Sequence, residues 1–448
     1  MTTIKVEKSF IWGVRLVKNK IILDTISIFL LSLVLSCNSN KPVEPEIWGG
    51  TGSMYIDSSP KGAEIFLFGT NTNVKTPGVV VNLKSKVYDV TLKLNGCKDT
   101  SLQVAVNDNW QTTRKLKLKE NISLWWTKYD KTNTSIGENY IMILKGRDND
   151  IWGATQSRGV FNIKNGVLKT YDPSNSNLAG WYTQSISLSP NMEVWVVTEG
   201  GLSKYDGNSW FTFPKTAEFN YDSIWKVFVD NKSIVWVSVS KFIQGKYDQA
   251  LYRFDGSNWM EYNSTNSKLP SGKRVTCMAS DSKNIKWFGT GDGLVKYDDS
   301  NWEIFTKKSM HLPQESVWAI FIDRGDTLWL STFGSNGLGG GLTKFYNNKS
   351  TSYNSKIFKG PSWDYKNDDM RSINIDTYGT KWIGTPDGMM EFVERKDETE
   401  IDFLYIYKNN NSGLQVSEIG FDCIYIDNQN NKWIGTWGGG VQLYKAKL

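Results

Sequence analysis

The chain has 448 residues, enough for two or three domains, and carries a formal net charge of +6. Residues 1–36 hold five basic and two acidic side chains, and the other charges are scattered without a run of Lys or Arg. This excludes the concentrated basic face that nucleic-acid binding needs. Twenty tryptophans, 39 glycines and 11 prolines instead indicate an all-β chain of many short strands and turns.

The N-terminus predicts an export signal. A basic stretch ends at Lys20, and the apolar run Ile26–Leu35 that follows is too short to span a bilayer comfortably. The run ends in Val34-Leu35-Ser36-Cys37, which resembles the lipoprotein box of bacteria. The resemblance implies that residues 1–36 are a lipoprotein signal peptide and that Cys37 is lipidated. An ordinary secretory signal and an uncleaved anchor are the alternatives.

We therefore expect a bacterial cell-envelope lipoprotein that is held at a membrane, such as the outer membrane, through its lipid. It would face the periplasm or the cell surface. Residues 37–50 are predicted to be the lipidated cysteine and a polar, proline-bearing tether.

Residues 51–119 are predicted to form a small β-sandwich. Strands of alternating polarity are expected around residues 54–57, 63–67, 79–83 and 88–94. The phrases Pro60-Lys61-Gly62-Ala63, Thr76-Pro77-Gly78 and Leu94-Asn95-Gly96 resemble the PEGA domain, a module of envelope proteins. That resemblance implies adhesion or spacing and brings no catalytic residues.

A phrase built on a tryptophan in a short apolar strand recurs seven times within residues 120–448. Its tryptophans are separated by 43, 41, 51, 42, 53 and 51 residues and are Trp152, Trp195, Trp236, Trp287, Trp329, Trp382 and Trp433. Each period has room for four short strands, which is typical of one antiparallel propeller blade. We expect these tryptophans to be core residues, because neighbouring blades would cover both faces of their strands.

In five copies an aspartate lies six residues before the tryptophan, at the first hairpin turn. These residues are Asp230, Asp281, Asp323, Asp376 and Asp427. Their fixed position predicts that each carboxylate caps backbone N–H groups of its turn. Calcium binding or the acid–base chemistry of paired carboxylates is the alternative.

The pattern resembles the two-component-regulator propeller repeat, D-x-x-G-x-x-W-x-G-T followed by G-G-L and a Tyr-Asp turn, over about residues 122–448. The resemblance implies a seven-bladed β-propeller of the kind found in the extracellular sensor part of membrane histidine kinases. Blade one departs because Asp148 lies only four residues before Trp152, and blade two departs because Ser189 replaces the aspartate. The last copy stops at Tyr444 without a fourth strand, so residues 122–130 are expected to supply it and close the ring.

Residues suited to catalysis or metal binding are few. His311 is the single histidine and has no nucleophile motif beside it, so we expect no metal, no cofactor and no catalytic residue. Cys97, Cys277 and Cys423 would remain after lipidation. The last two occupy equivalent places on the innermost strands of blades four and seven, too far apart for a disulfide, and are expected to be buried free thiols.

Ligand binding is expected on the face where the loops between the second and third strands open around the central channel. Aromatic and charged residues outside the core pattern fall on that face: Arg158, Trp181, Tyr182, Glu199, Lys241, Phe242, Asp292, Phe333, Trp363, Tyr365, Asp387 and Trp437. Flat rings with a few charges suit sugar faces or peptide side chains. Large loop aromatics also fill gaps between blades, so Trp363 and Trp437 are the strongest candidates for ligand contacts.

We therefore expect a monomeric, non-enzymatic envelope lipoprotein whose propeller face binds a glycan, a peptide or a protein. It would resemble a sensor without a kinase or output domain. One alternative is an interaction component of an envelope secretion or assembly machine. Another is a glycan-active hydrolase or lyase, because propellers host such enzymes and the Asp-turn-Trp phrase loosely resembles the sialidase Asp box.

Overall fold

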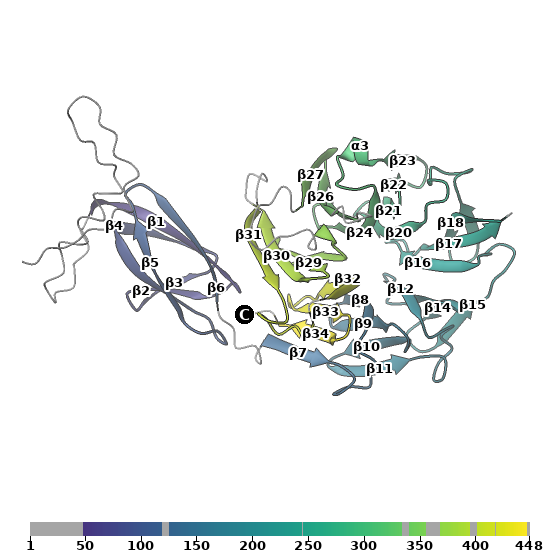
Figure 1. The fold of residues 1–448 in the computed structure, drawn as a ribbon, viewed down its shortest axis with the longest axis horizontal. Helices are drawn as coiled ribbons and strands as arrows, with labels where there is room; N and C mark the ends of the chain where they lie inside the picture. Colours follow the sequence, from purple (N-terminus) through teal and green to yellow (C-terminus); the bar gives the residue numbers. More distant parts are fainter. Residues whose placement is uncertain are drawn as a thin grey trace, which may run out of the picture. The chain divides into compact units, whose positions relative to one another are not determined.

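The computed structural model describes residues 48–118, 125–243, 245–333, 340–354, 368–394, 401–416 and 418–445. Within these ranges the chain is all-β apart from one short helix, α3 (Lys307–Met310) (Figure 1). His311 forms the C-cap of α3 in a left-handed conformation, with φ of 52°. The predicted signal peptide and Cys37 lie outside the described residues.

The N-terminal domain is a six-stranded sheet in the order β3-β2-β4-β1-β6, with β5 paired to β4. Its strands are β1 (Trp48–Ser59), β2 (Glu64–Leu67), β3 (Thr70–Lys75), β4 (Gly78–Lys93), β5 (Thr100–Val106) and β6 (Gln111–Lys117). Met54, Ile65 and Leu92 are among its fully buried side chains. The strands expected at 79–83 and 88–94 are one strand, β4, which continues between them through the buried Ser85; within it Asn82 has a φ of 58°.

In the described part of the chain after this domain, seven four-stranded sheets form the blades of a ring (Figure 1). The first strands of the blades are β8 (Ile141–Arg147), β12 (Thr183–Leu188), β16 (Ser223–Val229), β20 (Val275–Ser280), β24 (Ser316–Ile322), β28 (Ser372–Ile375) and β32 (Ile419–Ile426). The second strands are β9 (Asp150–Thr155), β13 (Val194–Thr198), β17 (Val235–Ile243), β21 (Lys286–Thr290), β25 (Leu328–Phe333), β29 (Lys381–Thr385) and β33 (Lys432–Thr436).

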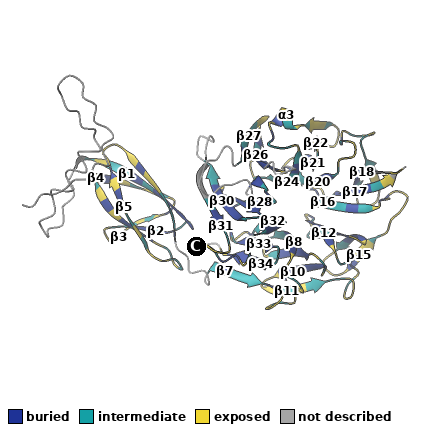
Figure 2. Ribbon diagram, viewed as in Figure 1, coloured by how far each residue is buried: buried dark blue, intermediate teal, exposed yellow. Residues whose placement is uncertain are grey.

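The outer half of each blade consists of the third and fourth strands. The third strands are β10 (Val160–Lys164), β14 (Gly201–Tyr205), β18 (Lys246–Phe254), β22 (Gly293–Tyr297), β26 (Gly341–Tyr346), β30 (Gly388–Glu394) and β34 (Gly440–Tyr444). The fourth strands are β11 (Val167–Tyr171), β15 (Trp210–Phe213), β19 (Trp259–Tyr262), β23 (Trp302–Phe305), β27 (Lys349–Tyr353), β31 (Ile401–Tyr407) and β7 (Trp126–Tyr129). The second strands are buried almost throughout, whereas β11 and β15 are largely exposed (Figure 2).

The ring is closed by a strand from before the first blade, as the sequence predicted. β7 pairs antiparallel with β34, with Trp126 opposite Tyr444 and Tyr129 opposite Val441. The rings of Trp126 and Tyr444 stack with their centroids 4.7 Å apart. The last blade is therefore built from both ends of the propeller sequence, and β7 pairs the edge of β34 that would otherwise be open.

The tryptophan of the repeated phrase is buried in every blade, with exposed fractions between 0% for Trp236 and 7% for Trp433. The turn aspartates cap their hairpins as predicted: Asp230 Oδ1 accepts the backbone N–H groups of Lys232 and Ile234 at 2.9 and 3.0 Å. The second carboxylate oxygen has a further partner, since Trp236 Nε1 donates to Asp230 Oδ2 at 3.1 Å. The same bond recurs in blades four to seven, at 2.9 to 3.3 Å.

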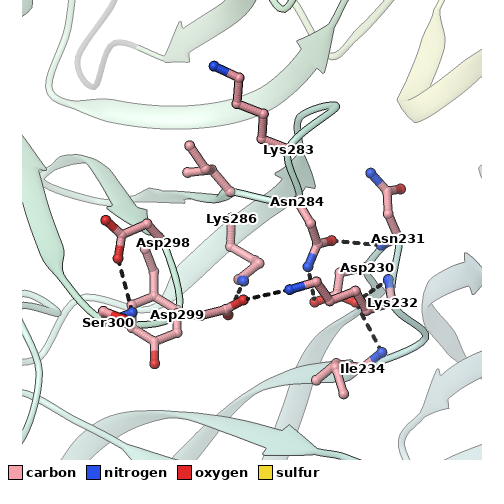
Figure 3. A network of polar contacts seen from close by, with 12 residues as sticks. Asp230, Asn231, Lys232, Ile234, Lys283, Asn284, Lys286, Asp298, Asp299 and Ser300 are labelled. Atoms are coloured by element: carbon pink, nitrogen blue, oxygen red, sulfur yellow. Dashed lines mark hydrogen bonds and ion pairs between the residues drawn. The ribbon is translucent and has the colours of Figure 1, made fainter.

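Polar contacts between turns join one blade to the next. In Figure 3, Asn284 of blade four accepts the backbone N–H of Asn231 at 3.0 Å and donates to Asp230 at 3.4 Å. Asp299 accepts from Lys232 of blade three and from the fully buried Lys286. Lys286 also lies 5.9 Å from the ring centre of Trp236 in the preceding blade. In the same arrangement, Lys381 lies over the ring of Trp329 and Lys432 lies over the ring of Trp382.

The two departures from the repeat affect turns and leave the blades intact. In blade one Asp148 lies in a tight turn with φ of 53°, between Arg147 and Asp150, which pair directly. In blade two Ser189 Oγ accepts only the backbone N–H of Glu193, at 2.9 Å, and Trp195 Nε1 has no partner among the described residues.

Candidate ligand site at the mouth of the channel

The first strands of the blades surround a central channel that contains a cavity of about 660 Å³. Five of these strands carry a β-bulge near their N-terminal ends. The bulged residues are Met142, Gln184, Trp225, Thr276 and Trp318, and all five line the cavity. A bulge re-aims a side chain and often occurs beside functional sites. The fold therefore repeats one irregularity so that a ring of variable side chains lines one end of the channel.

The last two blades place Arg371 and Asp422 at the corresponding positions. Arg371 directly precedes β28, and Asp422 lies in an irregular stretch of β32 with φ of 56°. The backbone N–H of Asp422 donates to the carbonyl oxygen of Arg371 at 3.0 Å, and both side chains line the cavity.

Aromatic rings and guanidinium groups gather at this end of the channel. We call this group the mouth cluster, and it consists of Trp225, Arg274, Trp318, Phe333, Arg371, Phe421 and Trp437.

The mouth cluster is continuous across five blades, from blade three to blade seven. Arg274 Cζ lies 4.8 Å from the ring centre of Trp225 and 5.9 Å from that of Trp318. Trp318 contacts the rings of Phe333 and Phe421, with centroids 5.5 and 5.6 Å apart. Stacking of this kind contributes about 0.5–2 kcal/mol per contact, so the rings and the Arg274 guanidinium hold one another in place.

The far side of the mouth cluster is centred on Arg371. Its guanidinium lies 4.6 Å from the ring centre of Trp437 and 5.0 Å from that of Phe421. Arg371 is also paired with carboxylates, at 3.0 Å to Glu418 and 3.4 Å to Asp369. These ion pairs fix Arg371 and neutralise much of its charge.

Hydrogen bonds orient the two tryptophans nearest Arg274. Trp225 Nε1 donates to Ser240 Oγ at 2.5 Å, and Trp318 Nε1 donates to Ser316 Oγ at 2.8 Å. By contrast, the donor Trp437 Nε1 and the acceptor Gln184 Oε1 have no partner among the described residues. Buried polar atoms usually have hydrogen-bond partners, and Gln184 lines the cavity, so its amide marks a position where a polar ligand group would be stabilised.

The lining of the channel is positively charged. Five basic residues line it, namely Lys145, Arg147, Lys226, Arg274 and Arg371, against one acidic residue, Asp422. Burial alone would raise the pKa of Asp422, but the nearby ammonium groups of Lys145 and Lys226 lower it overall. Lys145 Nζ lies 2.7 Å from the Asp422 carboxylate. Asp422 is therefore ionised at neutral pH and offsets only part of the positive charge.

Two of the residues predicted from sequence, Phe333 and Trp437, belong to the mouth cluster. Glu199 has a local role instead, because its carboxylate accepts the backbone N–H groups of Trp181 and Tyr182 at 2.9 and 2.8 Å. It thereby holds the loop that presents the exposed Tyr182 ring.

The other predicted residues make their contacts apart from the mouth cluster. Lys241 and Asp387 are engaged in ion pairs, with Glu261 and Lys408 respectively. The backbone N–H groups of Arg158 and Asp292 donate to threonine hydroxyls of their own loops, and the Phe242 ring is exposed. Trp363 and Tyr365 lie outside the described residues.

Sequence reasoning missed Trp225, Arg274, Trp318, Arg371 and Phe421. The three aromatic residues lie within first strands, where an aromatic side chain resembles core, and the two arginines directly precede the first strands β20 and β28. A usable signal was present, because Trp225, Trp318 and Arg371 each lie five residues before their turn aspartate. An alignment of the seven copies at the aspartate would have revealed this column.

Cys277 and Cys423 are free thiols on β20 and β32; Cys423 is buried as predicted, whereas Cys277 is only half-buried because it lines the channel cavity. Cys277 Sγ lies 3.7 Å from the carbonyl oxygen of Val317, and Cys423 Sγ lies 3.5 Å from that of Ile141, each in the next blade. Burial raises the pKa of the Cys277 thiol to about 12. Both groups therefore act as packing side chains.

Within the described ranges, no group of three His, Cys, Asp or Glu side chains is placed to hold a metal ion. None of the helices found there has the length and hydropathy needed to cross a bilayer.

Residues 51–122 match the PEGA domain family model, so this segment is a PEGA domain. No curated protein matches the chain in sequence. The extracellular domain of the putative hybrid two-component system BT3049 from B. thetaiotaomicron has a similar fold, with a TM-score of 0.54 and 20% identity, over 71% of this chain. The present chain spans only 41% of that protein's domain.

Two further structures share the propeller fold. A streptogramin B lyase has a TM-score of 0.53 and 12% identity, covering 72% of this chain and 98% of its own. Virginiamycin B lyase from Staphylococcus aureus, solved with quinupristin, has a TM-score of 0.52 and 14% identity, covering 71% and 98%. At these identities the likeness shows the fold alone.

Proposed function

We propose that this protein is a non-enzymatic, ligand-binding component of the bacterial cell envelope and that the mouth cluster binds an oligosaccharide. The observation that carries the proposal is the ring of aromatic faces and polar groups around a cavity of about 660 Å³. Cavities of this size are typical of small-molecule and oligosaccharide sites. Pyranose rings stack on flat aromatic faces, and their hydroxyls suit the unpartnered Gln184 Oε1.

The envelope location is part of the proposal. The motif Ser36-Cys37 after an apolar run supports lipidation of Cys37, and the PEGA domain would space the propeller from the membrane. The propeller would then act as a sensor or capture module that works as a monomer or passes its signal to an envelope protein partner.

A thermal-shift screen of the protein against a panel of oligosaccharides tests the proposal. A ligand at 100 times its dissociation constant adds about 2.7 kcal/mol to the free energy of unfolding, which raises Tm measurably. Analysis of the same samples for cleaved sugar separates binding from the hydrolase or lyase alternative. If no sugar shifts Tm and a stable protein partner is captured from envelope extracts, the machine-component alternative is favoured.

Replacing Trp437 links the screen to the mouth cluster. We expect Trp437→Ala to weaken binding of the best sugar about 3- to 10-fold, because one stacking face is lost, with little change in Tm. Trp110→Ala is the matched control, since Trp110 is 67% exposed in the N-terminal domain and should leave affinity unchanged. A large drop in Tm with unchanged affinity would instead assign Trp437 to the core.

A further inference from the structure

The basic residues of the channel differ in how their charges are compensated. Lys145 is paired with Asp422 at 2.7 Å, and Arg371 with Glu418 at 3.0 Å and Asp369 at 3.4 Å. Within the ranges that the structure describes, neither Arg274 nor Lys226 has a carboxylate within 4 Å. Arg274 therefore lacks a paired carboxylate, and Lys226 has only the longer-range attraction of Asp422, which is already paired with Lys145.

Arg274 is held in an orientation suited to an anion. Its guanidinium is stacked near Trp225 and Trp318, and both rings are fixed by hydrogen bonds to Ser240 and Ser316. Stacking occupies the face of the guanidinium and leaves the N–H donors at its edge available. That planar fork matches a carboxylate or sulfate in bidentate geometry, and less entropy is lost on binding because the group is already ordered.

Lys226 directly follows Trp225 on β16 and adds to the positive potential of the channel. Its charge, with that of Lys145, lowers the pKa of Asp422 despite the opposing effect of burial. An anion in the channel would experience the same field, which is only weakly screened inside a cavity.

We propose that the mouth cluster selects acidic oligosaccharides and that Arg274 binds a carboxylate or sulfate group of the sugar through its guanidinium edge. This inference rests on the proposed function and adds the chemical class of the ligand. A glycan is favoured over an acidic peptide because the same mouth offers stacking faces and the unpartnered acceptor Gln184 Oε1, which suits a hydroxyl donor.

The test compares ligands that differ only in charge. Isothermal titration calorimetry is run with tetragalacturonate, with its carboxyl-reduced neutral counterpart, with a sulfated form of that neutral sugar, and with tetraglutamate. We expect an acidic sugar to bind at least tenfold more tightly than the neutral one and to lose affinity as salt is raised from 50 to 200 mM. The carboxylate and sulfate arms show which anion the site prefers.

Variants assign the effect to Arg274. Arg274→Gln should lower the affinity for the acidic sugar roughly tenfold or more and change the affinity for the neutral sugar less than about twofold. Arg274→Lys should bind the acidic sugar with an affinity between those of the wild type and Arg274→Gln. Arg147→Gln is the matched control, because it also removes one positive charge. Arg147 lies at the C-terminal end of β8, away from the bulged Met142, and donates to the carbonyl oxygen of Pro190 at 2.6 Å. Tm of each variant confirms that the fold is retained.

Distinct outcomes separate the two proposals. Equal affinity for acidic and neutral sugars would overturn the selection of anions and leave the proposed function standing. Equal losses from Arg274→Gln and Arg147→Gln would overturn Arg274 as the binding residue. Binding of tetraglutamate with no binding of any sugar would overturn both proposals in favour of an acidic peptide.

Discussion

A single aspartate in each regular blade fixes both a hairpin turn and the tryptophan beneath it. In blade six, Asp376 Oδ1 accepts the backbone N–H groups of Tyr378 and Thr380 at 3.0 Å, and its other oxygen accepts from Trp382 Nε1, also at 3.0 Å. The carboxylate thus satisfies donors that burial would otherwise leave unpaired. Turn and tryptophan hydrogen bonding together account for an acidic residue at this one spacing in the repeat.

Blade two shows what happens without the aspartate and yields the first prediction. Ser189 lies six residues before Trp195, the same separation as Asp230 and Trp236, but it leaves Trp195 Nε1 unpartnered among the described residues. We expect Ser189→Asp to raise the free energy of unfolding by about 1 kcal/mol, because it supplies the missing acceptor. Chemical denaturation monitored by tryptophan fluorescence measures this.

The reverse substitution provides the control. Asp230→Ser should lower stability by about 1–3 kcal/mol, because Trp236 Nε1 and a turn N–H lose their partner. If Ser189→Asp were destabilising while Asp230→Ser behaved as expected, the cost of burying a carboxylate in blade two would exceed the value of the new hydrogen bond, and the equivalence of the two turns would be wrong.

At the scale of elements, the closing strand β7 depends on the turn that follows it. Asp130 accepts hydrogen bonds from the Thr132 hydroxyl and backbone N–H at 2.5 and 2.8 Å, and Lys128 Nζ lies 2.8 Å away. Burial alone would raise the pKa of Asp130, but the contacts with Lys128 and Thr132 lower it to about 2 from its usual 3.8. The ionised carboxylate therefore stabilises the end of β7.

This shift predicts a defined pH dependence. Because the folded pKa lies below the unfolded one, the unfolded state binds more protons, so the contribution of Asp130 is present above about pH 4 and is lost as pH falls through about 2. Asp130→Asn should cost about 1 kcal/mol at pH 7, and its difference from the wild type should shrink on acidification. Unfolding measured from pH 7 to pH 2 checks this, and a pH-independent difference would contradict it.

Features that depend on short spacings along the chain could be predicted from the sequence, whereas features that depend on packing between blades could not. Blade number, turn aspartates, buried tryptophans and β7 all depend on short, repeated spacings, and each is confirmed. The stacking of Lys286, Lys381 and Lys432 over the tryptophan of the preceding blade was not foreseen, because it depends on how blades pack. The continuous strand β4 was divided in two because polar Ser85 was not expected at a buried position.

The mouth cluster was harder to predict for a similar reason. Trp437 follows a second strand and Phe333 is the last residue of one, so both could be recognised as loop-side residues, whereas Trp225 and Trp318 lie within first strands and resemble core. Only the bulges turn these side chains into the channel, and a bulge has no simple sequence signature here. The charge of the channel likewise appears only when Lys145, Lys226 and Arg274, from three blades, are brought together.

For the propeller as a whole, each blade contacts both of its neighbours. The ring is closed in the last blade, where β7 from the start of the propeller meets β34 from its end. β7 contributes four residue pairs to β34, and Trp126 is 8% exposed between Tyr407 and Tyr444. The adjoining Trp433 stacks on Tyr129 with centroids 5.7 Å apart. Without β7 the last blade would expose both a strand edge and these aromatic rings.

Removing the closing strand therefore tests the ring as a unit. We expect deletion of residues 120–130 to lower the free energy of unfolding by at least about 3 kcal/mol, since loss of one buried Trp alone costs that much, and to promote self-association through the open edge of β34. Trp126→Ala should reproduce a large part of the loss, whereas Lys131→Ala, at an exposed position just after the strand, should change stability by less than about 0.5 kcal/mol. Calorimetry and size-exclusion chromatography measure the two effects. Unchanged melting after the deletion would mean that packing between the blades holds the ring together without closure, and the closing role of β7 would be wrong.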